Sequence, residues 1–201
     1  SWTNGNVTAT VTYGKNVTSN KKAGLGSANT ANATTVKVET NGTVYAEGTD
    51  AAGNKATAQL QISNIDKTKP TVSMSPNGGT YIMPTTGNAT IKTKLTASDA
   101  GGSGLNALQY AWATSSTTEP TTWTTFTNGS EIKKTDCTAG TYYLWTKVTD
   151  KAGNRADTVK VSSAFTVGAN TVADNKISIT ATPTSWTNGN VTATVTYGKN
   201  V

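Results

Sequence analysis

Histidine is absent from this sequence of 201 residues, and Cys137 is its single cysteine. Without histidine, the familiar serine and cysteine triads have no base, and zinc sites made from cysteine and histidine are excluded as well. One cysteine cannot form a disulfide within the chain, so the fold must depend on its hydrophobic cores. The eleven Asp and Glu residues also show no pairing in sequence that suggests glycosidase chemistry. We therefore predict that the protein is not an enzyme.

Charged residues are also scarce, at 14% of the chain, although the net charge is +6. The seventeen Lys and Arg residues are scattered singly or in pairs such as Lys21 and Lys22. Nucleic-acid binding usually needs clustered cations interleaved with stacking aromatic residues, so we expect no nucleic-acid partner. No apolar stretch reaches the roughly eighteen residues of a membrane-spanning helix, and we expect no membrane insertion within this segment.

What the sequence does contain is alternation of apolar and polar residues with a period of two. Such alternation predicts half-buried β-strands, and Asn-Gly pairs between the strands predict tight turns. Short strands separated by turns at roughly ten-residue spacing are typical of β-sandwiches. The predicted strands are Asn6–Tyr13, Thr34–Thr40, Thr43–Thr49, Ala56–Ser63, Thr71–Ser75, Ala89–Ser98, Leu108–Thr114, Thr141–Thr149, Asp157–Val167 and Ile177–Pro183.

Two internal repeats organise these strands. Ser1–Val17 and Ser185–Val201 are identical over seventeen residues, so the sequence repeats with a period of 184 residues. A period this long indicates one or two complete domains per unit. A fainter repeat places T-D-x-A-G-N at Thr49–Asn54 and again at Thr149–Asn154, each between two predicted strands. Because a linker follows each copy, we interpret both as the last hairpin of a sandwich.

The repeats predict an alternation of two kinds of sandwich. Residues 1–66 are predicted to form a type A sandwich that lacks its first strand, and residues 67–168 a longer type B sandwich. Residues 169–175 are predicted as a linker, and residues 176–201 as the start of the next type A domain. That last segment carries the strand that the first domain lacks, so we expect identical chains to associate head to tail by strand complementation.

The run D-K-T-K-P-T-V at Asp66–Val72, together with the two T-D-x-A-G-N hairpins, resembles the bacterial immunoglobulin-like repeat domains of large surface proteins. G-G-S-G-L-N-A-L-Q-Y-A-W-A-T-S at Gly101–Ser115 is similar to a longer variant found beside such repeats, usually in Gram-positive cell-wall or secreted proteins. The resemblance implies an all-β chain of tandem immunoglobulin-like or fibronectin III-like sandwiches. It also implies an extracellular location, on the cell surface or secreted, and a role as stalk, adhesin or filament component.

Calcium is the candidate cofactor, because extracellular sandwich arrays often stiffen their junctions with oxygen-ligand cation sites. The candidate metal ligands are two linker residues, Asp66 and Asp174, and Asp99 before the glycine-rich loop, with Asp50 and Asp150 in the two hairpins. The alternative is that these aspartates cap turns. High-affinity calcium sites normally gather several carboxylates, which here arrive singly in the sequence.

Two further candidates concern type B. Trp123 lies in a loop-like stretch and is the tryptophan that we expect to be exposed, where it could stack against a sugar. An isopeptide bond would need a buried lysine such as Lys92, Lys94 or Lys147 near an acid such as Glu131.

The sequence therefore predicts a structural repeat of a long extracellular bacterial surface protein, acting as stalk, spacer or filament subunit. Its partners would be neighbouring repeats of the same chain or identical chains. The alternative is an adhesive module that binds a glycan or a host protein.

Overall fold

A computed structural model of the protein describes residues 1–157, 160–170 and 177–197. These residues form sixteen strands and no helix, which confirms the all-β prediction. In the described part of the chain there is accordingly no helix long and apolar enough to cross a membrane. Asp174 lies outside the described residues.

The first sandwich contains six strands arranged in two sheets. The larger sheet has the order β3-β2-β5-β6, and the smaller sheet is the antiparallel pair β1-β4. The strands are β1 (Val7–Thr10), β2 (Ser19–Leu25), β3 (Thr30–Ala31), β4 (Thr35–Val38), β5 (Gly42–Thr49) and β6 (Lys55–Ile62). Small and β-branched side chains from both sheets fill the core, including Ala23, Val38 and Val44.

The second sandwich contains eight strands and a larger core. Its sheets have the orders β11-β10-β13-β14-β8 and β12-β9-β7. The strands are β7 (Thr71–Ser75), β8 (Gly79–Ile82), β9 (Ala89–Ser98), β10 (Leu105–Ala113), β11 (Thr124–Thr125), β12 (Glu131–Cys137), β13 (Gly140–Asp150) and β14 (Phe165–Gly168). Buried Ile91, Leu95, Leu144 and Phe165 lie at its centre, and Trp112 packs edge-on against Phe165 with 5.4 Å between the ring centroids.

The burial pattern of β9 shows why the alternation was informative. Every second residue from Ala89 to Ala97 is buried and the residues between them are exposed, as expected for a strand with one face on a core. The same two-residue period in β7 buries Val72 and Met74. Each sandwich therefore results from strands whose apolar faces find one another across two sheets.

The third part of the described chain is a hairpin, β15 (Ile177–Thr182) paired antiparallel with β16 (Thr192–Tyr197). All residues of both strands are exposed. Trp186, in the loop between them, is entirely exposed, whereas Trp2, its twin in the first repeat copy, is 37% exposed.

Several strands differ from the sequence prediction. We predicted one strand over Asp157–Val167, but among the described residues of this range regular pairing is confined to β14, and Val161 makes only an isolated bridge to Trp145. The predicted strands also do not include β2, β3, β8, β11, β12 and β16. Of these, β8 pairs with β14 in parallel. β2 and β8 lack the alternation of apolar and polar residues on which the prediction depended.

Candidate metal centre

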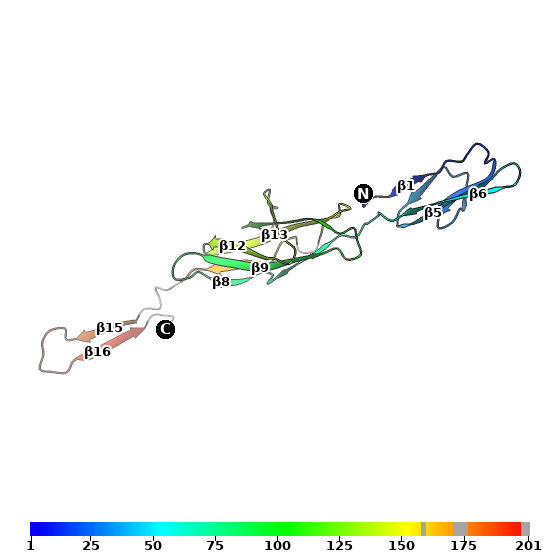
Figure 1. Ribbon diagram of the computed structural model, residues 1–201. Helices are drawn as coiled ribbons and strands as arrows, with labels where there is room; N and C mark the ends of the chain where they lie inside the picture. The colour runs from blue at the N-terminus through cyan, green and yellow to red at the C-terminus, as the bar shows by residue number, and fades with distance from the viewer. Residues whose placement is uncertain (158–159, 171–176, 198–201) are drawn as a thin grey trace.

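The joint between the two sandwiches consists of residues that are fastened on both sides. Ile65 is buried in the first core, and the side chain of Asn41 accepts a hydrogen bond from its N–H at 2.8 Å and donates one to its C=O at 2.9 Å. The next residue, Asp66, donates its backbone N–H to the C=O of Thr3 at 2.9 Å. Its own C=O accepts a hydrogen bond from Nδ2 of Asn154 in the second sandwich, also at 2.9 Å. Successive residues of the linker are therefore attached to the two sandwiches, which the linker joins in Figure 1.

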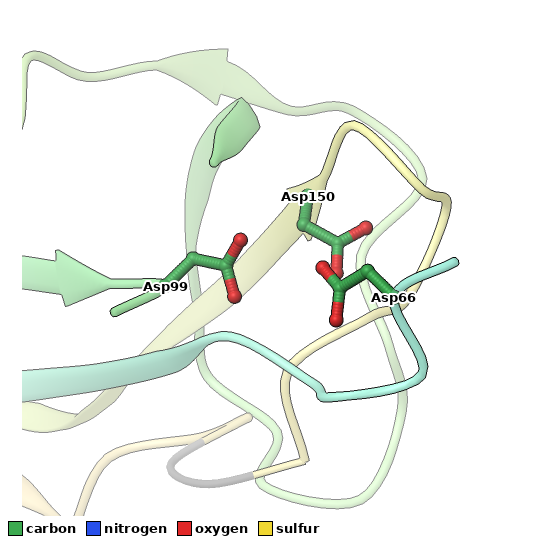
Figure 2. A group of neighbouring side chains, drawn as sticks. All are labelled: Asp66, Asp99 and Asp150. Carbon is green, nitrogen blue, oxygen red and sulfur yellow. The ribbon is translucent and has the colours of Figure 1, made fainter. Parts of the chain in front are cut away.

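Three of the five candidate aspartates meet at this joint. Asp66 comes from the linker, Asp99 follows β9, and Asp150 ends β13. Each carboxylate offers one oxygen atom within 4.8 Å of those of the other two. Figure 2 shows the three side chains converging on the same space from three different segments. The fold thus brings the three residues into one cluster, although Asp66 and Asp99 are 33 positions apart in the sequence and Asp99 and Asp150 are 51 positions apart.

Backbone N–H groups position two of these carboxylates. Asp66 Oδ1 accepts a hydrogen bond from the N–H of Thr68 at 2.9 Å, and its Oδ2 accepts one from the N–H of Ser103 at 2.6 Å. Asp99 Oδ2 accepts a hydrogen bond from the N–H of Gly104, also at 2.6 Å. The loop that follows Asp99 therefore holds both side chains at once.

The third carboxylate is positioned by its own hairpin. Asp150 Oδ1 accepts a hydrogen bond from the backbone N–H of Asn154 at 2.8 Å, and its Oδ2 accepts one from Nδ2 of the same residue at 2.7 Å. This is the turn-capping arrangement that the alternative interpretation predicts for aspartate in this motif. Asp150 has no exposed surface, so it caps the turn and belongs to the cluster simultaneously.

One oxygen in the cluster has no partner. Asp99 Oδ1 is inaccessible to solvent and makes no hydrogen bond in the structure. A buried carboxylate oxygen without a partner is costly, because its desolvation is not compensated. Gly102 lies directly against it: a Cβ at that position would be 2.5 Å from Asp99 Oδ1 and 2.8 Å from Asp66 Oδ2. Because Gly102 has no side chain, its backbone can lie this close to the two carboxylates.

The electrostatics of the cluster call for a cation. Burial raises the pKa of Asp66, but hydrogen bonds from the N–H groups of Ser103 and Thr68 and from the Ser103 side chain outweigh it and hold the pKa below 3.8. Asp66 is therefore ionised in the folded protein although it is only 6% exposed. Within residues 1–157, 160–170 and 177–197, no Lys or Arg forms an ion pair with any of the three aspartates. Two carboxylates that were both ionised at such separations would repel by about 3 kcal/mol at an effective dielectric constant of about 20.

Calcium fits this set of ligands. The cluster offers only oxygen atoms, which are the ligands of hard cations, and it contains no cysteine or histidine that would favour zinc or copper. Three carboxylates supply fewer than the six to eight oxygen ligands that calcium takes, so water and backbone carbonyl groups would complete the shell. The single chemical role of such an ion is to neutralise the cluster and connect Asp66 with Asp99 and Asp150.

Asp50, the hairpin candidate of the first sandwich, lies apart from this cluster. Its Oδ1 accepts hydrogen bonds from the N–H groups of Ala52 at 2.9 Å and Asn54 at 2.8 Å, and its Oδ2 accepts one from Nδ2 of Asn54 at 2.8 Å. These hydrogen bonds, led by that from the Asn54 side chain, lower the pKa of Asp50. Among the described residues, no other acidic group joins it in a cluster. In the structure Asp50 is a turn cap.

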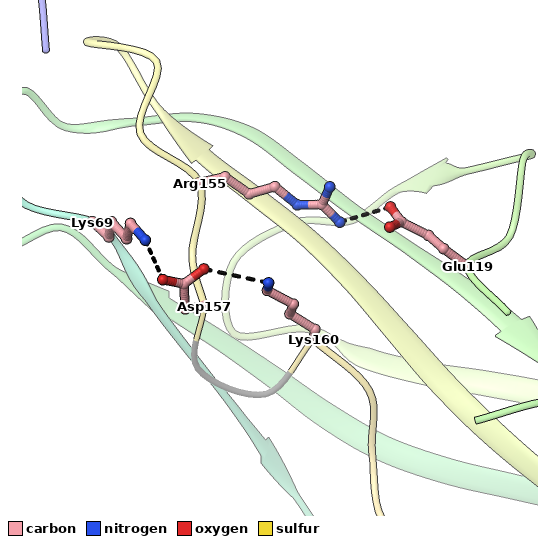
Figure 3. A network of polar contacts seen from close by, with 5 residues as sticks. All are labelled: Lys69, Glu119, Arg155, Asp157 and Lys160. Atoms are coloured by element: carbon pink, nitrogen blue, oxygen red, sulfur yellow. Dashed lines mark hydrogen bonds and ion pairs between the residues drawn. The ribbon is translucent and has the colours of Figure 1, made fainter. Parts of the chain in front are cut away.

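A surface ion-pair network lies on the second sandwich beside the start of β7 (Figure 3). Lys69, in the linker, donates a hydrogen bond to Asp157, which also forms an ion pair with Lys160 at 3.4 Å. Arg155 forms an ion pair with Glu119 at 2.7 Å. These side chains are substantially exposed, so each pair contributes little to stability by itself. The Lys69 contact nevertheless adds a second attachment of the linker to the second sandwich.

Trp123 and the isopeptide candidates occupy other surfaces of the second sandwich. Trp123, which we expected to be exposed, is half-buried, and Nζ of Lys147 lies 5.8 Å from the centroid of its ring. Lys92 lies 4.0 Å from Glu131 as an ion pair in which both side chains are about half exposed. An isopeptide bond normally needs a buried lysine, whereas Lys92 and its strand neighbour Lys94 are exposed.

The residues that shape the cluster around the three aspartates were not among those predicted from the sequence. Ser103 and Asn154 are buried and hold Asp66, and Gly102 provides the close approach described above. The glycine-rich run after Asp99 was the available signal, because a backbone that must approach another group closely often uses glycine. The partner of that loop could not be read from the sequence, since Asp66 belongs to a distant segment.

A scan against protein-family models finds no match, and a search of curated proteins finds none. Among solved structures, the chain is similar to the fibronectin(III)-like modules of Clostridium thermocellum CbhA, with 16% identity over 83% of this chain and 85% of that chain. The TM-score is 0.35, and this similarity assigns neither a family nor a function. The described strands themselves define the class, which is an all-β chain with β-sandwiches of the immunoglobulin-like or fibronectin III-like kind.

Proposed function

We propose that this chain is a structural repeat of a long extracellular bacterial surface protein, in which it acts as a stalk, spacer or filament subunit. The observation that carries the proposal is the joint, where Ile65 is held by the first sandwich and Asp66 by the second. A joint whose successive residues are attached to different sandwiches would keep the direction of one sandwich relative to the next. Recurrence of seventeen identical residues after 184 positions supports the same role, because a repeated unit extends an array in proportion to its copy number.

The dimensions of the sandwiches suit a spacer. The longest strand, β13, has eleven residues, which corresponds to about 36 Å at about 3.3 Å per residue. The two sandwiches lie end to end rather than side by side (Figure 1). One pair therefore extends roughly twice the length of a sandwich, or about 70 to 80 Å including the joint. Such a unit would hold an adhesive or catalytic domain away from the surface that anchors it.

Calcium has a specific role in this proposal. An ion bound by Asp66, Asp99 and Asp150 would connect the linker to two strands of the second sandwich and neutralise three carboxylates at once. The joint would then be rigid in the calcium-rich medium outside cells. Removal of calcium would leave the linker attached by hydrogen bonds, with charge repulsion acting against them.

Calorimetric titration of the chelator-treated chain with calcium tests the site. We expect one site for the unaltered chain and for Asp50→Asn, and no binding heat for Asp99→Asn. Asp50→Asn is the matched control, because it removes the same charge from the twin hairpin. Absence of calcium binding by the unaltered chain would contradict the site and indicate that the carboxyl groups share a proton instead.

Small-angle scattering of the same samples tests the spacer role. We expect the long dimension of the two sandwiches in calcium to match an end-to-end arrangement, and chelator to broaden the distribution of distances. A compact particle in both conditions would contradict the spacer role, whatever the calorimetry shows. Equal extended particles in both conditions would keep the spacer role and remove calcium from it.

A further inference from the structure

The outer face of the smaller sheet of the second sandwich carries an excess of lysine. Lys92 and Lys94 are exposed on β9, and Lys133 is exposed on β12. In the pairing of these two strands, Lys133 lies directly opposite Lys92. Glu131 lies opposite Lys94 in the same pairing. Because opposed residues are about 5 Å apart and alternate residues of a strand about 7 Å, these four side chains are neighbours on one surface, which we call the lysine face.

One carboxylate serves the three lysines of this face. Glu131 Oε1 lies 3.4 Å from Nζ of Lys133 and 4.0 Å from Nζ of Lys92. Lys94 forms no ion pair with any residue that the structure describes. The next acid along β12 is Asp136, which follows a register shift in the pairing with β9. The lysine face therefore has three positive charges and one negative charge, a net charge of +2.

The smaller sheet of the first sandwich has no such excess. Its strands β1 and β4 contain one lysine, Lys37, which lies opposite Thr8. Nζ of Lys37 is 2.6 Å from Oε1 of Glu39, so its charge is balanced by a neighbour on the same strand segment. The excess of positive charge therefore belongs to the second sandwich and not to both sandwiches.

The rest of the lysine face is rich in hydroxyl groups. The other exposed positions of β7 and β9 are Thr71, Ser73, Ser75, Thr90, Thr96 and Ser98. No exposed position of β7, β9 or β12 has an apolar or aromatic side chain. The hydroxyl group of Thr71 donates to the C=O of Ser98 at 3.3 Å, and that of Ser73 donates to the C=O of Thr96 at 3.4 Å. A hydroxyl oxygen that donates its proton keeps its lone pairs, so both can still accept a hydrogen bond from a ligand.

These properties favour one class of partner. The opposed ammonium groups of Lys92 and Lys133 repel each other, and a negative charge placed between them would remove that repulsion. Protein partners usually need an aromatic or aliphatic anchor at the centre of the contact, where lysine is depleted. Single-stranded nucleic acids need aromatic side chains on which their bases stack. An acidic polysaccharide needs neither, because its carboxylates bind ammonium groups and its hydroxyl groups bind serine and threonine.

From these observations we propose that the lysine face binds an acidic polysaccharide. Lys92, Lys94 and Lys133 contact carboxylate groups of the polymer, and the hydroxyl groups of β7 and β9 contact its sugar hydroxyls. The inference goes beyond the proposed spacer function, which requires no such ligand. In an array, each unit of this kind would add one weak contact with the same polymer, and linked weak contacts give a high overall affinity.

Fluorescence anisotropy of a labelled oligogalacturonate, which carries one carboxylate per sugar, tests the binding. The titration is made in chelator, because the carboxylates of the probe also bind calcium. We expect the unaltered chain to bind at low ionic strength. Combination of Lys92→Gln, Lys94→Gln and Lys133→Gln in one chain should weaken binding by about tenfold or more, because it removes every cation of the face.

A second triple variant is the matched control. It combines Lys15→Gln, Lys22→Gln and Lys37→Gln, which replace three exposed lysines of the first sandwich. Both triple variants lower the net charge of the chain by three, from +6 to +3. We expect the control to weaken binding by less than about twofold, because long-range attraction to the net charge is screened by salt.

Removal of the acid on the lysine face gives a test in the opposite direction. Glu131→Gln deletes the negative charge among the three lysines, and we expect it to strengthen binding several-fold. Glu39→Gln is its control, because it removes the acid beside Lys37 and should leave binding unchanged. None of the substituted side chains belongs to a hydrophobic core, so the variants should keep the fold, which urea unfolding checks.

Four results would overturn the inference. Equal weakening by both triple variants would show attraction to the net charge and not to the lysine face. Equal binding of a neutral dextran would show that carboxylates are not recognised. Tighter binding of polyphosphate or single-stranded DNA with the same number of charges would show that the partner is not a polysaccharide, and absence of binding would show that the face takes no polyanion. The scattering experiment on the spacer role uses no polysaccharide, so either proposal can fail without the other.

Discussion

The hairpins at Thr49–Asn54 and Thr149–Asn154 have the same motif and the same turn, but different surroundings. In each, the aspartate accepts hydrogen bonds from the backbone and the side chain of the asparagine four residues later, at 2.7 to 2.8 Å. Asp150 is entirely buried beside two other carboxylates, whereas Asp50 is partly exposed and belongs to no such group in the described chain. The motif determines the turn, and the neighbours determine whether the turn can also bind a cation.

The difference arises from the strand that lies opposite the hairpin. Alignment of Pro183 with Pro76 places β15 on β7, and the 184-residue repeat places β16 on residues 8–13. In this alignment Leu95 of β9 corresponds to Ala9, and Asp99 corresponds to Tyr13. Tyr13 donates its hydroxyl group to the C=O of Ala33 at 3.1 Å. A tyrosine at this position removes one of the three carboxylates, so the first sandwich could not repeat the cluster even with an aspartate in its preceding linker.

Replacement of each hairpin aspartate by alanine should reveal the largest difference between the two hairpins. Asp150→Ala leaves the buried N–H of Asn154 without its acceptor, removes one of the two acceptors of its Nδ2 group and removes one ligand of the proposed ion. We expect a loss of about 3 kcal/mol in the free energy of unfolding of the second sandwich in calcium. Urea unfolding followed by tryptophan fluorescence measures it, because Trp145 is buried in this sandwich.

The control for this prediction is Asp50→Ala. The transition reported by the second sandwich should stay where it is, since Asp50 contacts only its own turn. A shift of equal size in both variants would mean that the two aspartates have the same role, and that the cluster adds nothing to the turn.

Alanine at Gly102 tests the close approach that only the second sandwich contains. The added Cβ would lie 2.5 Å from Asp99 Oδ1, a distance that forces the loop or the carboxylates to move. We expect a loss of about 2 kcal/mol in the free energy of unfolding and weaker calcium binding. Gly14→Ala is the matched control in the first sandwich, where a Cβ meets no atom within 4 Å. Its expected effect is small and on the stabilising side, because it restricts the unfolded chain.

Alternation predicted the strands whose faces differ most in polarity. The predicted bounds of β7 and β9 agree with the structure, because each buries every second side chain in one core. β2 was missed because Ser19–Leu25 includes two lysines, a glycine and an asparagine and buries only two adjacent residues, Ala23 and Gly24. β8 was missed because Gly79–Ile82 is short and its pairing with β14 depends on a segment more than eighty residues away.

The candidate site was predictable only as a set of residues. The sequence indicated Asp66, Asp99 and Asp150 through the linker, the glycine-rich loop and the hairpin, and the structure brings these three together. The sequence could not show that Asp150 joins a cluster and Asp50 does not, because the two aspartates lie in equivalent motifs. The difference between their surroundings depends on residue 99, which lies in another segment. Binding of calcium by the cluster stays a prediction.

Acidification tests the turn cap of the first sandwich, and its expected effect is the smallest of those predicted here. Hydrogen bonds from Asn54 and the turn backbone hold the pKa of Asp50 below 3.8. The stabilisation that this implies is fully present above that value and is lost as the pH falls through the lower pKa of the folded state. Nuclear magnetic resonance of the amide groups of Ala52 and Asn54 should therefore show a titration below pH 3.8. In Asp50→Asn the same amides should not move over this range, and a titration above the ordinary value would contradict the turn-capping role of Asp50.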